Sequence, residues 1–144
     1  MIMDSFGELA VRQSLPSTTG RTLAIDNIDQ GSIGAQIGAD VYLVVLVTEI
    51  ATSGGAAKAT FELVSDAQGG IATDGSATLH AGLGPVPLAQ LTAGARFAVP
   101  MPPGPYEKYF GLIVNVTGAG FTGGKYSAFL TLDVAKWVAL PDAL

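Results

Sequence analysis

Apolar and polar positions alternate along short stretches of the chain, and glycines and prolines separate these stretches. Residues 40–50, DVYLVVLVTEI, are apolar almost throughout, which predicts a central strand buried on both faces. Residues 57–66, AKATFELVSD, alternate instead and predict a half-exposed strand. Its apolar face is Ala57, Ala59, Phe61 and Leu63, and its polar face is Lys58, Thr60 and Glu62. The SGG loop between the two stretches permits a hairpin.

A second pair of strands is predicted at residues 108–116 and 125–134, joined by the glycine-rich turn TGAGFTGG with Phe121 at its tip. Weaker strand patterns occupy residues 8–15, 21–25, 76–80 and 95–99. Residues 87–94 suit one helical turn, since Pro87 stands at the start and Gly94 after the end. Short strands separated by 19 glycines and 8 prolines predict one all-β domain, a sandwich or a barrel.

The composition favours assembly. Charged residues make up 13% of the chain against a usual share of about 25%, and mean hydropathy is +0.44. The longest apolar run, residues 41–47, is too short to span a membrane, and the first residues do not resemble a secretory signal. The seven bases are scattered and the net charge is −5, which disfavours nucleic-acid binding. We therefore expect a cytoplasmic product without membrane or nucleic-acid partners.

Candidate chemistry is sparse. His80 is the single histidine and cysteine is absent, so a zinc site built on these ligands is not expected. No Gly-x-Ser-x-Gly motif is present to expose a nucleophile beside His80. Glu49 and Glu62 would be neighbours only if their strands pair. The acidic turn at residues 26–31 and the glycines of residues 31–38 lack the spacing of calcium and phosphate loops. We expect no enzyme, no metal and no cofactor.

Four blocks, in order, carry a resemblance: residues 41–50, 57–66, 91–118 and 121–134, with the corner Arg-Phe-x-x-Pro-x-Pro-Pro-Gly at residues 96–104. Over residues 25–134 the chain resembles the capsid cement, or decoration, proteins of tailed bacteriophages. The resemblance implies a jelly-roll-like β-sandwich, without catalysis or cofactor, that is made in the bacterial host cytoplasm. It implies binding to the outer surface of the virion capsid, where the protein bridges major capsid proteins. A homotrimer is expected, with a dimer as the alternative.

The expected organisation is an N-terminal arm and first strand (residues 1–20), a sandwich domain (residues 21–136) and a C-terminal tail (residues 137–144). Prolines fix φ, so the corner would reach an interface with little freedom left to lose. A plain corner between sheets is the alternative. A carbohydrate-binding β-sandwich is the alternative function, with Tyr106 and Trp137 as its aromatics. The candidate interface residues are Phe6, Arg12, Pro102, Pro103, Tyr106, Phe121 and Trp137.

Overall fold

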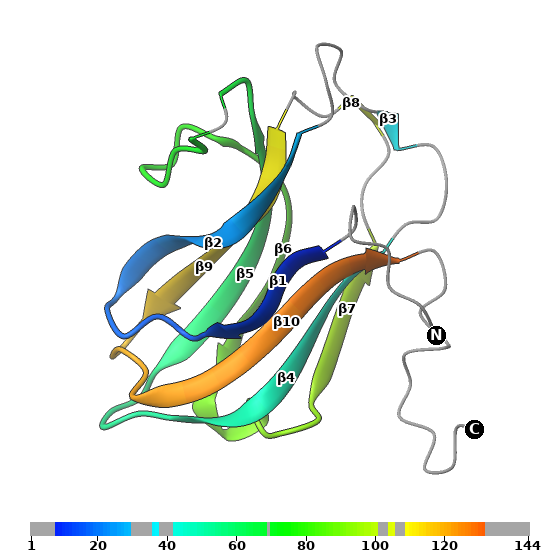
Figure 1. The fold of residues 1–144 in the computed structure, drawn as a ribbon. Helices are drawn as coiled ribbons and strands as arrows, with labels where there is room; N and C mark the ends of the chain where they lie inside the picture. Colours follow the sequence, from blue (N-terminus) through cyan, green and yellow to red (C-terminus); the bar gives the residue numbers. More distant parts are fainter. Residues whose placement is uncertain are drawn as a thin grey trace, which may run out of the picture.

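The computed structural model describes residues 8–29, 36–37, 42–68, 70–100, 104–105 and 109–131. Two antiparallel four-stranded sheets face each other (Figure 1). In spatial order, the front sheet contains β1 (Glu8–Ser14), β10 (Gly123–Thr131), β4 (Tyr42–Thr52) and β7 (Arg96–Pro100). The back sheet contains β2 (Gly20–Asp29), β9 (Tyr109–Thr117), β5 (Lys58–Asp66) and β6 (Thr78–Pro87). A third, two-stranded sheet pairs β3 (Gln36–Ile37) with β8 (Gly104–Pro105). The predicted all-β sandwich is confirmed.

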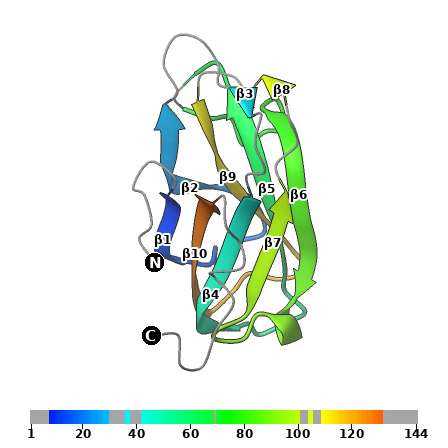
Figure 2. The same ribbon diagram turned by 90° about the vertical axis from the view of Figure 1, so that its right-hand side faces the viewer.

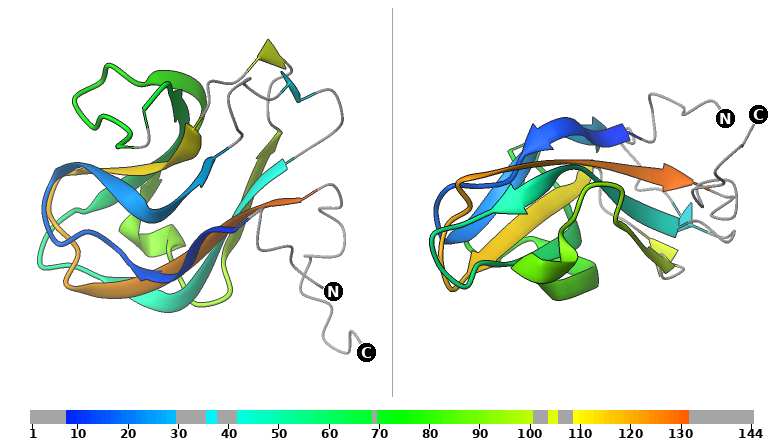
Figure 3. Two further views of the ribbon diagram at one scale, coloured as in Figure 1. Left: turned by 45° about the horizontal axis from the view of Figure 1, so that its top comes forward. Right: turned by 90° about the horizontal axis from the view of Figure 1, so that it is seen from below.

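The connections give the sandwich its jelly-roll character. Apart from the short β3 and β8, strands that follow one another in sequence lie in opposite sheets, except for β5 and β6. Figure 3 shows the chain crossing between the sheets at the end where β9 leads into β10. Both predicted hairpins are therefore wrong: β4 does not pair with β5, and β9 does not pair with β10. Glu49 and Glu62 accordingly lie on different sheets, so they do not form a carboxylate pair.

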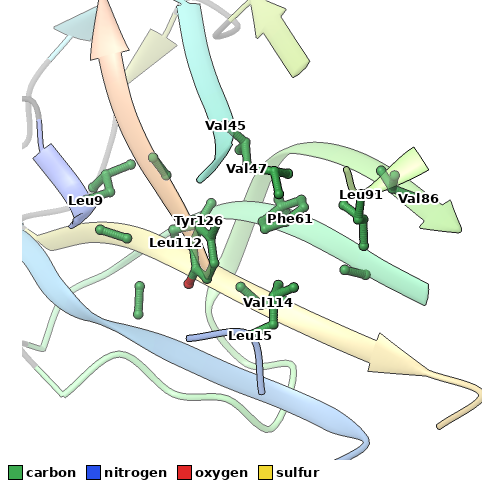
Figure 4. Close-up of a cluster of buried hydrophobic side chains, with 14 of the residues drawn as sticks. Leu9, Leu15, Val45, Val47, Phe61, Val86, Leu91, Leu112, Val114 and Tyr126 are labelled. Atoms are coloured by element: carbon green, nitrogen blue, oxygen red, sulfur yellow. The ribbon is translucent and has the colours of Figure 1, made fainter. Parts of the chain in front are cut away.

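Inward-facing side chains of both sheets form the main core (Figure 4). The aromatic rings of Phe61 on β5 and Tyr126 on β10 meet edge to face, with ring centroids 5.4 Å apart. This contact joins the two sheets and adds to the energy of apolar burial. Burial also raises the pKa of the Tyr126 phenol above its ordinary range, because the ionised form loses its water.

Two strands show how far the hydrophobic pattern predicted burial. On β4, Leu43, Val44 and Val45 are fully buried, which confirms a central strand buried on both faces. On β5 the apolar face points inward as expected, but the strand is not half-exposed. Glu62 on its opposite face is 8% exposed, and Val64 there packs with Ile71 from the connection to β6. A loop distant from any strand pattern thus covers a face that looked solvent-facing.

The weaker strand patterns correspond to β1, β2, β6 and β7, although β2 and β6 extend further than their sequences indicated. The helical turn predicted after Pro87 is a single 3-10 turn, Leu88–Gln90, with Pro87 at its N-cap. Gly94 follows with a φ of +85°, a conformation that glycine adopts at little cost. Local turn chemistry therefore predicted this connection well.

The glycine-rich turn after β9 packs against two other loops. A Cβ on Gly120 would lie 1.9 Å from the Ser17 carbonyl oxygen, so only glycine permits this approach. The Phe121 N–H donates a hydrogen bond to the Pro16 carbonyl, and the Phe121 side chain is 2% exposed in the core. The prediction that Phe121 lies at an exposed tip is wrong, because the three loops close over that end of the sandwich. Phe121 is removed from the candidate interface.

Candidate interaction surfaces

The β3–β8 ladder lies apart from the two main sheets, at one end of the sandwich (Figure 2). In its register Gln36 is opposite Pro105 and Ile37 is opposite Gly104. It lies beyond the end of β7, where Pro100 pairs with Tyr42. The last part of the proline corner is therefore tied to a segment almost seventy positions earlier in the sequence, which restricts it further. Sequence reasoning missed this ladder, because a two-residue strand has no measurable period.

Five of the seven candidate interface residues lie outside the described residues: Phe6, Pro102, Pro103, Tyr106 and Trp137. Their assignment to an interface stays a prediction. Arg12 is the one remaining candidate, since Phe121 is buried.

Arg12 lies on β1, at the edge of the front sheet, and is exposed. Its φ of +47° is unusual for a residue with a side chain, and its N–H donates a hydrogen bond to Ser127 Oγ at 3.0 Å. The register shifts here between Ala10 and Gln13, which defines a β-bulge. A bulge interrupts the regular edge of a sheet, so this strand is a poor template for unwanted strand pairing.

A small pocket of about 130 Å³ opens on the outer face of the back sheet. Its polar part is an ion pair between Arg21 on β2 and Glu62 on β5, with Arg21 Nε 3.1 Å from Glu62 Oε1. The remaining lining residues are Val64, Ala72, Gly75, Ala77, Leu79 and Ile113. The exposed fractions of the two charged side chains are 40% and 11%, so the carboxylate depends on the guanidinium for most of its compensation. The pocket offers an apolar wall beside a neutralised charge pair.

We expect Arg21→Met to lower the free energy of unfolding by about 1–2 kcal/mol, because it leaves the Glu62 carboxylate enclosed without its partner. The double variant Arg21→Met with Glu62→Gln should recover part of that loss in urea denaturation. The matched control is the pair of Lys125 and Glu49, whose nitrogen and oxygen are also 3.1 Å apart but whose side chains are 46% and 59% exposed. In a double-mutant cycle of the same design, the coupling energy between Lys125 and Glu49 should stay below about 0.5 kcal/mol. Equal coupling for both pairs would contradict this explanation.

His80 lies on β6, and its Nε2 is 2.6 Å from Ser65 Oγ on β5. Ser65 is fully buried, so the contact satisfies a hydroxyl enclosed by the fold. In this arrangement the serine oxygen has no surface on which a substrate could bind. We therefore interpret His80 as a structural residue of the back sheet, where it is a hydrogen-bond partner of Ser65.

Among the described residues, no group of three or more histidine, cysteine, aspartate or glutamate side chains is arranged to hold a metal ion. Within that same part of the chain, no helix is long and apolar enough to cross a membrane.

Comparison with known families finds a match for most of the chain. A family model described as Bbp16 matches residues 13–130, which run from β1 to β10. The chain belongs to the Bbp16 family. No curated protein matches the chain. The Bbp16 match includes the back sheet, the front sheet apart from most of β1, the Arg21–Glu62 pocket and the proline corner. Arg12, Phe6 and Trp137 fall outside it.

Proposed function

We propose that this Bbp16-family chain is a structural decoration protein that binds the outer surface of a phage capsid and bridges neighbouring major capsid proteins. The observation that carries the proposal is the Bbp16 match, whose residues 13–130 include almost all of the four blocks that resemble capsid cement proteins. The jelly-roll-like connectivity agrees with what that resemblance implies. On this proposal the protein acts by binding and not by catalysis, and it is found on the virion after synthesis in the host cytoplasm.

The geometry suggests which end of the molecule meets the shell. The β3–β8 ladder, which includes Gly104 and Pro105, projects from one end of the sandwich, whereas the loops around Phe121 close the other. A projecting segment held by both prolines and a ladder loses little conformational entropy on binding. We assign the capsid contact to this proline end, and we keep Arg12, on β1 at the opposite edge of the front sheet, as a separate candidate contact.

Co-sedimentation tests the proposal. Purified protein is mixed with capsids that lack it, and bound protein is measured across a concentration series. We expect saturable binding at a fixed number of copies per shell, with an oligomeric mass by light scattering of a trimer, or of a dimer as the alternative. A glycan array tests the carbohydrate-binding alternative with the same sample. Glycan binding without co-sedimentation would replace the capsid proposal with that alternative.

A further inference from the structure

The pocket on the outer face of the back sheet has fixed walls. Val64 on β5 and Ile113 on β9 line it from the sheet, and the connection between β5 and β6 contributes Ala72. Ile71 holds this connection on the sheet by packing against Val64 and Ile113. The Ala72 N–H also donates a hydrogen bond to the Asp66 carboxylate at 3.2 Å. A pocket that exists before binding costs a ligand less ordering than one that must form on binding.

The volume of the pocket sets the size of its ligand. At about 130 Å³ it is slightly smaller than an apolar cavity of about 150 Å³, which holds one benzene molecule. Apart from the ion pair, its lining residues are apolar or glycine. The pocket therefore suits one branched aliphatic group of the size of a leucine side chain.

The ion pair sets the charge of the ligand. A guanidinium has five N–H donors, and the bond to Glu62 uses the one on Arg21 Nε. The Arg21 side chain is 40% exposed, which leaves donors on its Nη atoms for a ligand. A carboxylate bound there would be repelled by Glu62, and an ammonium group would be repelled by Arg21. A neutral carbonyl accepts a hydrogen bond from Arg21 without either repulsion.

We propose that this pocket binds a leucine-sized side chain of a partner protein, with a neighbouring peptide carbonyl of that partner accepting a hydrogen bond from Arg21. Leu79 lines the pocket and is 58% exposed. A ligand that only fills the pocket leaves Leu79 in water, whereas a polypeptide that continues past the pocket covers it. Side chains that fill such pockets commonly dominate the binding energy of an interface. The inference does not depend on the proposed function, which assigns the capsid contact to the proline end.

Methyl NMR provides the first test, with N-acetyl-leucine methylamide as the probe. We expect saturable shifts of the Val64, Leu79 and Ile113 methyl groups, with a Kd on the order of 1 mM for a ligand of this size. N-acetyl-glycine methylamide, which lacks the side chain, should shift none of them. Absence of saturable shifts with the leucine probe at concentrations well above that value would overturn the proposal.

Two charged relatives of the probe test the role of the ion pair. N-acetyl-leucine carries a free carboxylate and leucine methylamide carries a free ammonium group, so both keep the side chain and change the charge. We expect both to bind several-fold more weakly than the neutral probe. Tighter binding of either one would mean that the pocket takes a charged small molecule and not the interior of a polypeptide chain.

Substitutions in and around the pocket test its location and its partner. Ala72→Leu should fill the pocket and raise the Kd of the leucine probe at least tenfold. The tripeptide acetyl-Thr-Leu-Thr-amide should bind several-fold more tightly than the single-residue probe, and Leu79→Ala should remove this gain. Ile50→Ala is the matched control, because Ile50 is also 58% exposed but lies on β4 in the other sheet. Unchanged binding to Ala72→Leu would place the site elsewhere, and equal affinity for tripeptide and single residue would overturn the assignment to a protein partner.

Discussion

Replacing Phe121 with alanine is expected to lower the free energy of unfolding by about 3–5 kcal/mol. The side chain is 2% exposed and belongs to the main core, so its removal forfeits apolar burial and leaves a cavity. The surrounding loops cannot collapse readily into that cavity. The Phe121 N–H is hydrogen-bonded to Pro16, and the next N–H, of Thr122, donates to the Thr52 carbonyl at 2.7 Å. Since small domains are stable by about 5–15 kcal/mol, this variant should come close to the limit of folding.

Urea denaturation followed by circular dichroism measures the effect. Leu79→Ala is the control, because Leu79 is 58% exposed and its truncation should change stability by no more than about 0.5 kcal/mol. Conversely, a Phe121→Ala variant of unchanged stability that no longer binds capsids would show that Phe121 acts at an interface. That outcome would contradict the packing seen here.

The alternating pattern predicted which side of a strand faces the core but not which strand is its neighbour. Phe61 and Leu63 point inward, as the alternation of residues 57–66 indicated. Alternation assigns faces with a period of two, and it carries no information about the partner strand. The SGG and TGAGFTGG loops therefore read equally well as hairpin turns and as crossings between sheets. Only the packed sandwich distinguishes the two.

The sequence pattern did not predict that Phe121 is buried, for a related reason. A phenylalanine between glycines looks like an exposed tip, because glycines commonly mark turns at the surface. Here Gly118 and Gly120 serve close backbone approach, to Ala56 and Ser17 respectively. Such contacts join positions far apart in sequence, so no local pattern reveals them.

For the candidate sites too, some features could be predicted from the sequence and others could not. The rigidity of the proline corner was predictable, because proline restricts φ wherever it stands. The ladder that ties Pro105 to Gln36 was not, and neither was the ion pair between Arg21 and Glu62. Each of these contacts joins residues separated by tens of positions on different strands. Their chemistry is ordinary, and only the register of the strands brings them together.

The N-terminal arm is also a candidate contact with the capsid, and deleting residues 1–15 would be the direct test of its contribution. Leu9, Ala10 and Leu15 are buried in the core, so removing all fifteen residues would disrupt the front sheet itself. Deleting residues 1–7 alone leaves β1 complete. We expect this deletion to weaken retention on capsids more than Lys125→Ala does, since Lys125 forms an exposed ion pair with Glu49 that contributes little.

On the proposed function, decorated capsids should keep this protein through a wash in 1 M sodium chloride. The seven bases of the chain are scattered, and two of them, Arg21 and Lys125, already pair with carboxylates of the same chain. An interface built on such charges would loosen at 1 M salt, where the Debye length falls to about 3 Å. Apolar burial is not screened, and high concentrations of strongly excluded salts even strengthen it. Gel analysis of sedimented capsids before and after the wash measures retention for the full chain, the 1–7 deletion and Lys125→Ala. Release by salt alone, with the deletion harmless, would mean that exposed ion pairs hold the protein on the shell.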